Sequence, residues 1–425
     1  MEMKKYKLEN LCTKITDGSH YSPVAVESGY PMFSVKDMEE FGFSYTDVKL
    51  ISEDDFQKMC ENDCVPQKND VLVAKDGSYL KEAFVCMETK KEAILSSIAI
   101  FRPNIKLVNP YYLAYLFKTP NVYNYVTNGC VSGTALPRIV LKAFKQIEVF
   151  IPSLKQQNNV VSVLSSLDDK IALNKKINAK LEAMAKRLYD YWFVQFDFPN
   201  GEGKPYKTSG GKMVWNEVLK RKIPEGWEVK CVNDISVSYR GVGYSASDEK
   251  SANDKDVMLI LRGNNISNNH IVYDKNTVYL DKSFVSEEQK INKFDILMTM
   301  SSGSKEHVGK SSMFLFDSPH SYGAFCNKIT PNKECQFFLE NYLHSEFFKK
   351  YIKVTCSGTG INNLTNQHFD KARFAFPTKI ILNLFNEKVK TCYEQIGFLE
   401  QEIQKLTKLR DRLLPLLMNG QVEVE

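Results

Sequence analysis

The feature that most constrains the fold of this chain is an internal repeat, in which similar residues recur 225 positions apart. The matched pairs are Asp70 and Asp295, Ser132 and Ser357, Thr134 and Thr359, Phe144 and Phe369, and Pro152 and Pro377. Solenoid repeats have periods of about 20 to 50 residues, so a period this long indicates a duplicated domain instead. We therefore expect two globular domains built on one plan.

A long helix is predicted after the first copy of the globular domain. Residues 156–192 contain no glycine or proline, and Pro152 stands just before them, where its missing N–H costs little. Apolar residues recur at alternating steps of three and four, which is the heptad pattern of helices that pack together. A helix of this length would span roughly 55 Å, which is too long for the interior of a small domain and indicates a spacer.

The same shift reproduces this helix near the C-terminus with its heptad phase preserved. The predicted seam residues are Leu167, Ile171, Asn174, Asn178, Leu181 and Leu188 in the first helix, and Ile396, Leu399, Ile403, Leu406 and Leu413 in the second. Neither helix can bury its seam alone, so we favour an antiparallel pair that buries both seams and holds the globular domains apart. The alternative is that each helix packs on its own globular domain. Asn174 and Asn178 would cost stability in a buried seam but would fix its register.

These patterns predict an α+β fold with an internal pseudo-twofold repeat. Two mixed α/β domains are expected, separated by two long helices that form an antiparallel coiled coil. The predicted boundaries are a first globular domain at 1–152, a central spacer helix at 153–193, a linker at 194–222, a second globular domain at 223–377 and a C-terminal spacer helix at 378–425. Pro415 should kink or end the last helix, and Gly420 should close it.

Short patterns predict a similar order of elements in both globular domains. The first domain shows strand patterns at 70–74, 93–101 and 147–152, and a helix that starts after the capping residue Asn109. The second domain shows strand patterns at 295–300, 313–316 and 373–376, and a helix pattern at 337–353. Each globular domain is therefore expected to mix helices and strands.

Composition and charge limit the classes to which the chain can belong. The ten cysteines show no paired metal-ligand spacing, and no run approaches the roughly 18 apolar residues of a membrane span. The N-terminus carries no apolar signal region, so we expect a cytoplasmic protein. The net charge of +5 is only mildly basic, so any nucleic-acid footprint must be local.

No motif supports catalysis by this chain. Residues 109–112 are similar to the Asn-Pro-Pro-Tyr motif of amino-methyltransferases but lack its second proline. Residues 241–246 match a dinucleotide-binding glycine pattern without its strand–helix context, and residues 228–230 resemble the end of a nuclease site without a paired acid. We therefore expect no catalytic residue, no metal and no cofactor in this chain.

Polar loops offer a better candidate site. Loops at equivalent places in the two domains mix Gly, Ser, Thr and Asn with basic or aromatic side chains, which suit phosphate positioning and base reading. The candidates in the first domain are Gly18, Ser19, His20, Lys75, Ser78, Lys81, Ser132, Thr134 and Arg138. Those in the second domain are Arg240, Tyr244, Arg262, Ser302, Lys305, Ser357, Thr359, Asn362 and Asn363. Each residue taken singly fits a solvated turn as well, and the pairing of the loops favours the set.

The whole chain resembles the specificity (S) subunit of bacterial type I restriction–modification enzymes. The resemblance is carried by the central segment LDDKIALNKKINAKLEAMAKRLYDYWFVQFDFPNGEGKPYKTSGGKMVWNEVLKRKIPEGWEV, by the C-terminal LEQEIQKLTKLRDRLLPLLMNGQVEV and by ITDGSHYSP near the start. It implies that each globular domain is a target-recognition domain that reads one half of a split, asymmetric sequence in double-stranded DNA. The helices would then act as a ruler between the two halves.

The resemblance also implies partners and their cofactors. Two modification subunits, which carry S-adenosylmethionine and methylate adenine, would dock on the helical regions. Restriction subunits, which are motor-nucleases, would use ATP and magnesium to translocate and cut DNA. If Asn174 and Asn178 face a partner subunit instead of the second helix, the packing of the ruler differs in detail.

Two other classes of function stay open at this point. One is a fused DNA methyltransferase or nuclease with its own recognition domain, which would need a cofactor motif. The other is a two-headed protein-binding scaffold with no DNA role. Phosphate contacts give binding a steep dependence on salt, whereas a dry protein interface does not, so salt dependence separates the scaffold from a DNA-binding protein.

Overall fold

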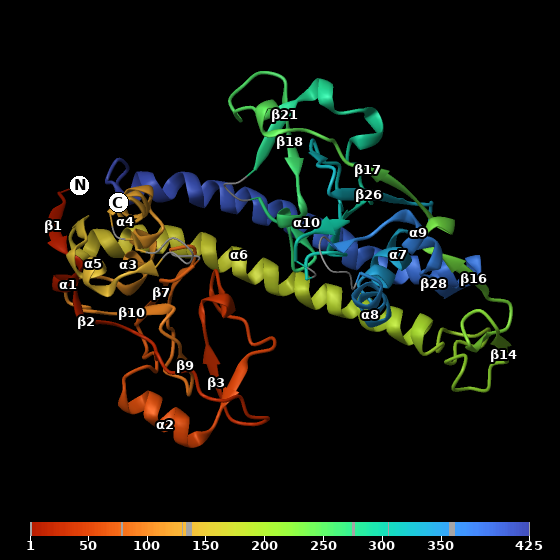
Figure 1. The fold of residues 1–425 in the computed structure, drawn as a ribbon, viewed down its shortest axis with the longest axis horizontal. Coiled ribbons are helices and arrows are strands. Elements are labelled where there is room, and N and C mark those ends of the chain that lie inside the picture. Colours follow the sequence, from red (N-terminus) through yellow and green to blue (C-terminus); the bar gives the residue numbers. More distant parts are fainter. Residues whose placement is uncertain are drawn as a thin grey trace. The chain divides into compact units, whose positions relative to one another are not determined.

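The computed structural model describes residues 2–77, 80–129, 131–132, 138–273, 277–304, 306–356 and 362–424 (Figure 1). The chain forms two compact units, of which unit 1 comprises Met1–Asn174 and Glu402–Glu425 and unit 2 comprises Lys175–Gln401. Each unit therefore contains one globular domain and a segment of each long helix.

Unit 1 is built on two small sheets. The first has the antiparallel order β2 (Cys12–Asp17), β10 (Ile98–Pro103), β7 (Val71–Ala74) and β8 (Ala83–Val85). The second has the order β6 (Lys49–Ile51), β3 (Tyr30–Phe33) and β9 (Ala93–Ile94), with β3 and β9 parallel. The helices are α1 (Leu8–Leu11), α2 (Glu53–Glu61), α3 (Pro110–Phe117), α4 (Pro120–Gly129) and α5 (Leu141–Gln146). The side chain of Asn109 caps α3 as predicted, since it accepts from the backbone N–H of Tyr111 at 2.8 Å.

Unit 2 repeats this plan strand for strand. Its first sheet has the order β17 (Ser236–Arg240), β26 (Cys326–Pro331), β22 (Ile296–Thr299) and β24 (Ser311–Met313). Its second sheet has the order β21 (Val278–Asp281), β18 (Val257–Leu261) and β25 (Ser321–Tyr322), with β18 and β25 parallel. The helices are α7 (Gln336–Leu343), α8 (Glu346–Thr355) and α9 (Asn366–Lys371). The predicted duplication is confirmed.

Shorter strand pairs also recur in both units. An outer pair joins β1 (Lys4–Lys7) to β13 (Glu148–Ile151) in unit 1 and β16 (Glu228–Cys231) to β28 (Arg373–Phe376) in unit 2. A hairpin follows the second sheet's central strand, formed by β4 (Met38–Glu39) and β5 (Gly42–Phe43) or by β19 (Ile266–Ser267) and β20 (His270–Ile271). The last pairs are β11 (Val131–Ser132) with β12 (Arg138–Ile139), and β23 (Ser301–Ser302) with β27 (Asn362–Asn363).

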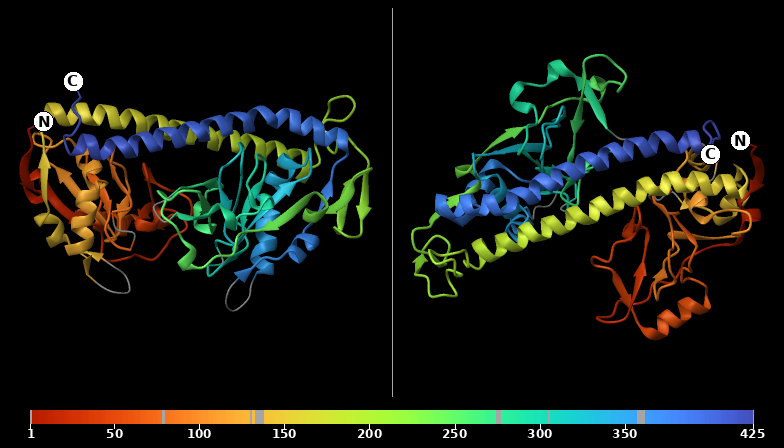
Figure 2. Two further views of the ribbon diagram at one scale, coloured as in Figure 1. Left: turned by 90° about the horizontal axis from the view of Figure 1, so that it is seen from above. Right: turned by 180° about the vertical axis from the view of Figure 1, so that it is seen from behind.

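Within each unit, the segments of the two long helices, α6 (Leu154–Tyr189) and α10 (Lys379–Met418), run antiparallel and side by side (Figure 2). In unit 1 the start of α6 meets the end of α10, where Leu164 shares a hydrophobic cluster with Leu414 and Leu417. In unit 2 the end of α6 meets the start of α10, where Ala185 and Tyr189 share a cluster with Phe385. The predicted antiparallel pairing is confirmed. Both clusters also include residues of the globular domains, so the helices pack on each other and on those domains at once.

The seam residues divide into two groups by burial. Ile171, Asn174, Asn178, Ile396 and Leu399 are buried, and the others are half-buried: Leu167, Leu181, Leu188, Ile403, Leu406 and Leu413. Asn174 donates through its side-chain amide to Glu402 on α10 at 2.7 Å. This hydrogen bond forms only when Asn174 lies opposite Glu402, so it favours one register of the two helices. Fixing the register is the role predicted for the buried asparagines.

Three local predictions differ from the structure, and a fourth, for the end of α10, is confirmed at Gly420 but not for an end at Pro415. Residues 93–101 are two strands, β9 and β10, joined by a turn, and residues 337–353 fall into two helices, α7 and α8. The strand predicted at 313–316 is β24, which ends at Met313. Pro415 does not end α10, which continues to Met418, with Gly420 in the left-handed region beyond it at φ 68°. Pro415 has no backbone N–H, so it cannot make the hydrogen bond to the carbonyl one turn earlier. Because Pro415 lies close to the end of the helix, the loss of this bond does not stop the helix.

The segment predicted as a linker has regular structure of its own. A π-helical turn (Asp190–Val194) follows α6, and strands β14 (Met213–Asn216) and β15 (Arg221–Pro224) form a hairpin. The ring of Phe198 stacks on Trp227 with centroids 5.1 Å apart, which ties the segment to the unit 2 core. The glycine and proline content of this segment predicted an irregular linker, whereas part of the segment forms a helical turn and a hairpin.

A buried polar cluster lies beside the helices of unit 2. Glu340 on α7 is 7% exposed, and its Oε1 lies 3.3 Å from Nδ1 of His344. Burial raises the pKa of Glu340 to about 8, and burial lowers the pKa of His344 to about 4. Nearby, His270 of β20 lies 3.2 Å from Glu182 of α6 and 2.9 Å from Glu400 of α10. Glu340 and His344 are therefore both uncharged near neutral pH.

Replacing Glu340 with glutamine is expected to make the stability of the protein depend less on pH between pH 6.5 and pH 8. Between its ordinary pKa of 4.5 and its folded pKa of about 8, Glu340 keeps a proton that the unfolded chain releases, so stability falls as the pH rises through this window. Glutamine does not ionise, so the loss of stability between pH 6.5 and pH 8 should be smaller in the variant by about 1 to 2 kcal/mol. Urea unfolding of both proteins at pH 6.5 and pH 8 would measure this difference.

The exposed Glu346 on α8 provides the matched control for this prediction. Glu346→Gln should leave the difference in stability between pH 6.5 and pH 8 as it is in the unchanged protein. A Glu340→Gln variant that keeps the same pH dependence as the unchanged protein would contradict the buried, protonated state of Glu340.

Candidate nucleic-acid interface

A short turn lies at the centre of the candidate site in each unit. In unit 1 it is Leu95–Ser97, which joins β9 to β10, and in unit 2 it is Gly323–Phe325, which joins β25 to β26. Each turn leads from the second sheet of its unit into the first. In unit 1 the turn lies inside residues 93–101, for which the sequence predicted one continuous strand. In unit 2 the sequence predicted no element at the turn.

In unit 1 the turn binds loops that are far apart in the sequence. The backbone N–H of Ser96 donates to the carbonyl of Ser19 at 2.9 Å, and the N–H of Lys75 donates to the carbonyl of Ser97 at 2.9 Å. The N–H of Ile139 then donates to the carbonyl of Lys75 at 3.1 Å. These bonds bring together the loop after β2, the loop after β7 and strand β12, each of which carries predicted site residues.

Unit 2 reproduces these bonds one for one. The N–H of Ala324 donates to the carbonyl of Val242 at 2.9 Å, and the N–H of Met300 donates to the carbonyl of Phe325 at 2.9 Å. The N–H of Leu364 donates to the carbonyl of Met300 at 2.7 Å. We call each set of loops, together with its central turn, the loop cluster of its unit. The structure thus places the described parts of the predicted loops of each unit in one cluster.

Two glycines allow the close approach within these clusters. A Cβ added to Gly18 would lie 2.3 Å from the carbonyl oxygen of Ile94, and one added to Gly241 would lie 2.3 Å from that of Gly323. Such distances are far inside van der Waals contact, so only glycine fits there. Gly18 was a predicted site residue, and its structural role is this backbone approach.

The unit 1 candidates differ in how accessible their side chains are. His20 and Lys81 are exposed, and the hydroxyl of Ser19 donates to the carbonyl of Tyr21 at 2.7 Å. Lys75 is buried, with its Nζ 3.3 Å from Asp17 and 3.2 Å from Asp76. The charge of Lys75 is therefore compensated within the protein, and a buried ion pair is an expensive place from which to contact a phosphate.

The unit 2 candidates place exposed polar and cationic groups around the turn. Arg240 and Asn363 are exposed, and Tyr244, Arg262 and Ser302 are half-buried. A Cβ on Gly323 would lie 3.3 Å from the ring of Tyr244 and 3.9 Å from Cγ of Arg262, so these two side chains lie beside the turn. Burial raises the pKa of Tyr244, against the opposing effect of Arg262, and its hydroxyl stays protonated at neutral pH. This cluster therefore places hydrogen-bond donors beside the turn.

Some predicted site residues fall at the edge of what the structure describes. Ser78, Thr134, Lys305, Ser357 and Thr359 lie outside the described residues, and Ser132, Arg138 and Asn362 are described only as strand backbone in β11, β12 and β27. Their contact with DNA stays a prediction. The sequence reading did not select the central turn residues, although Gly323-Ala324 and Ser96-Ser97 interrupt apolar runs and could have marked a turn.

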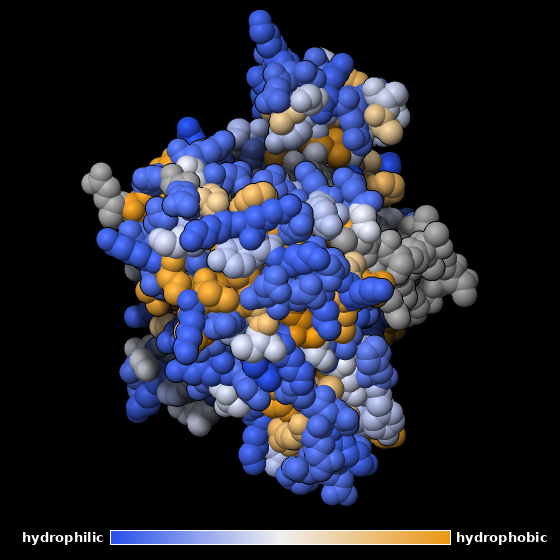
Figure 3. Space-filling model, turned by 90° about the vertical axis from the view of Figure 1, so that its left-hand side faces the viewer, coloured by the Kyte–Doolittle hydropathy of each residue, from blue (hydrophilic) through white to orange (hydrophobic). Residues whose placement is uncertain are grey.

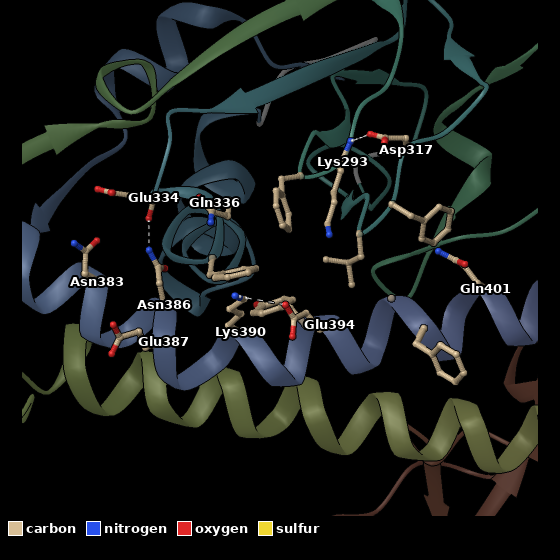
Figure 4. Close-up of a pocket in the computed structure, with 17 residues that line it drawn as sticks. Lys293, Asp317, Glu334, Gln336, Asn383, Asn386, Glu387, Lys390, Glu394 and Gln401 are labelled. Carbon is tan, nitrogen blue, oxygen red and sulfur yellow. Dashed lines mark hydrogen bonds and ion pairs between the residues drawn. The ribbon is translucent and has the colours of Figure 1, made fainter.

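A cavity of about 770 Å³ lies elsewhere in unit 2, between α10 and the globular domain (Figure 4). Its charged lining residues are the acids Asp317, Glu334, Glu387 and Glu394 and the lysines Lys293 and Lys390. An excess of carboxylates repels a polyanion, so this cavity does not suit the DNA backbone. The face of the molecule in Figure 3 is mostly hydrophilic and is interrupted by small hydrophobic patches.

Two features are absent from the described residues. None of the helices in the described part of the chain is long and apolar enough to cross a membrane. In the same ranges, no three His, Cys, Asp or Glu side chains are grouped so that they could hold a metal ion.

Comparison with known proteins matches both copies of the repeat to one family. Residues 1–183 and 224–408 match the type I restriction modification DNA specificity domain. The type I restriction enzyme MjaIX specificity subunit of Methanocaldococcus jannaschii is 27% identical over 322 residues, which cover 74% of this chain and 69% of that protein. The type I restriction enzyme HindI specificity subunit of Haemophilus influenzae is 26% identical over 412 residues, which cover 84% of this chain and 87% of that protein.

A solved structure has the same fold. The crystal structure of a type I restriction–modification S subunit from M. genitalium aligns with a TM-score of 0.52 at 14% sequence identity. The alignment covers 98% of this chain and 96% of that one.

Proposed function

Since this chain belongs to the type I restriction modification DNA specificity family and is a non-catalytic DNA-specificity subunit, we propose that its two units each read one half of a split DNA target. Unit 1 would contact one half-site through its loop cluster, and unit 2 would contact the other. The helix pair formed by α6 and α10 would set the gap between the halves.

The observation that carries this proposal is the pair of equivalent loop clusters. The same backbone bonds hold both clusters, but the side chains on them differ: the positions of Ser19, His20 and Lys75 in unit 1 are occupied by Val242, Gly243 and Met300 in unit 2. A shared backbone frame with different side chains suits two readers of different sequences. The proposed target is therefore asymmetric, and the exposed Arg240 would supply hydrogen-bond donors to base edges in the second half.

The partners follow from the same proposal. Modification subunits that carry S-adenosylmethionine would methylate adenine in the target, and restriction subunits would use ATP and magnesium, so that this chain needs no cofactor of its own. The repeat offers two equivalent surfaces, which supports two modification subunits per chain. Exposed apolar side chains on the helices, such as Leu173, Met184 and Leu384, supply apolar area for such docking. The complex would act in the cytoplasm on cellular DNA.

Methylome sequencing of a methylation-deficient host tests the proposal. The host would express this chain with and without a modification subunit from the same operon. We expect a split motif with adenine methylation in both halves when both proteins are present, and no methylation when either is missing. Methylation by this chain alone would support the fused enzyme instead.

Binding of the purified complex to the motif duplex at several salt concentrations completes the test. Phosphate contacts predict a steep fall of the association constant with salt. A flat salt dependence together with no methylated motif would overturn the proposed function in favour of the protein-binding scaffold.

A further inference from the structure

Phe325 occupies an unusual place in the loop cluster of unit 2. Its side chain is 69% exposed, although its neighbours Tyr322 and Cys326 are fully buried. An exposed phenylalanine contributes little to the core, and its apolar surface is unfavourable in water. The residue therefore contributes little to the fold through its side chain.

The backbone of Phe325 is fixed from several sides. Its carbonyl accepts from the N–H groups of Met300 at 2.9 Å and Ser301 at 3.2 Å. The preceding turn residues are held as well, because Gly323 donates to the carbonyl of Leu261 and Ala324 donates to that of Val242, both at 2.9 Å. The exposed ring is thus mounted on a rigid turn, which keeps low the entropy that binding would cost.

The equivalent turn of unit 1, Leu95–Ser97, shows that this turn can form without a phenylalanine. Ser97 stands at the position of Phe325, since its carbonyl accepts from the N–H groups of Lys75 and Asp76 in the same way. The hydroxyl of Ser97 accepts from the backbone N–H of Val35 at 3.0 Å, so this small side chain serves the fold. The turn therefore forms without an aromatic residue, and a reason for Phe325 has to be sought outside the fold.

We propose that Phe325 makes an apolar contact to a thymine methyl group in the half-site read by unit 2, and so helps to specify that base pair. This inference rests on the proposed function. The thymine methyl is the apolar group that base pairs present in the major groove, and phenylalanine is among the side chains that contact it. The polar side chains beside the turn, Tyr244 and Arg262, supply hydrogen bonds, whereas Phe325 supplies the apolar surface that they lack.

The test begins with the split motif of the unchanged protein and its modification subunit, determined by methylome sequencing. If no split motif is found, the proposed function fails before Phe325 is examined. The variant Phe325→Ala is then sequenced in the same way. We expect base preference to relax at one position of a single half-site, by about tenfold, which is the scale of a single mismatched base pair. The other half-site should be unchanged.

Phe347→Ala is the matched control, because Phe347 on α8 is also an exposed phenylalanine of unit 2, at 57%. It should leave both half-sites as they are. Phe325→Ser, which copies the residue of unit 1, should act like Phe325→Ala. Both Phe325 variants should melt at the temperature of the unchanged protein, since the side chain is exposed.

A second measurement identifies the group that Phe325 contacts. The motif duplex is made with deoxyuridine in place of thymine at the affected position, which removes only the methyl group. The unchanged complex should lose affinity on this duplex to the extent that Phe325→Ala loses it on the normal duplex, and the variant should not distinguish the two duplexes. The slope of binding against salt should stay the same, because phenylalanine carries no charge.

Three outcomes would overturn the inference. An unchanged motif in the Phe325→Ala variant would show that the ring does not read a base. Equal losses in both half-sites would indicate a general effect on assembly. A deoxyuridine penalty of the same size in the variant as in the unchanged protein would show that the methyl is read by another residue.

Discussion

Replacing Arg410 with alanine is expected to lower the free energy of unfolding of unit 1 by about 3 to 5 kcal/mol, because it leaves a buried carboxylate without its counter-charge. Arg410 of α10 donates through Nη1 to Asp168 of α6 at 2.9 Å and also pairs with Glu40. The hydroxyl of Tyr115 donates to the same Asp168 at 2.6 Å. The Arg410 and Asp168 side chains are only 13% and 11% exposed, so solvent screens their interaction little. Burial opposes the charge of Arg410, but Glu40 and Asp168 outweigh it and raise its pKa.

Urea unfolding, with hydrogen exchange of unit 1 peptides to locate the loss, would measure this effect. Arg412→Ala is the matched control, since Arg412 lies on the same helix and is exposed. The double variant Arg410→Met with Asp168→Leu should recover much of the loss, because a buried ion pair can often be replaced by apolar residues. A loss below about 1 kcal/mol in Arg410→Ala, which is typical of a surface pair, would contradict the buried role of this network.

The large-scale fold could be predicted from the sequence because its signals are long. The repeat and the heptad pattern extend over many residues, and neither helix can bury its seam without a partner. The network around Arg410 shows where this reasoning ends. The repeat aligns Arg410 with Ala185, a small buried residue of α6, and nothing in the spacing shows that Asp168 and Glu40 meet the guanidinium. Such contacts depend on side chains from three separate segments.

The candidate site was predictable as a set of loops but not as a geometry. Polar composition selected the loops near Ser19 and Tyr244, and the structure brings them to the central turns by backbone bonds between distant segments. The turn at Leu95–Ser97 was missed because a run of apolar and β-branched residues hides it inside a strand pattern. Lys75 was predicted as a site residue because of its charge. Its ion pairs with Asp17 and Asp76 could not be predicted from the sequence and are seen only in the structure.

Lengthening the helix pair by one heptad is expected to widen the gap between the two half-sites by about three base pairs, without changing the bases read. The insertion has two parts, seven residues after Ile177 in α6 and seven after Phe398 in α10. The bond from Asn174 to Glu402 sets the antiparallel register that makes these points face each other. Adding a whole heptad to both helices preserves the seam. Seven helical residues add roughly 10 Å at 1.5 Å each, and a DNA base pair rises about 3.4 Å.

Methylome sequencing with the modification subunit reads out both the gap and the bases of each half-site. Insertion into α6 alone is the informative control. The added heptad then has no partner residues on α10, so this variant should be less stable and should not give a single new gap. A double insertion that folds and methylates with the original gap would contradict the proposal that the helices set the spacing, and altered bases with the original gap would place the effect in the loop clusters. A wider gap with both half-sites unchanged would separate the two tasks of the chain, since base reading would belong to the loop clusters and spacing to α6 and α10.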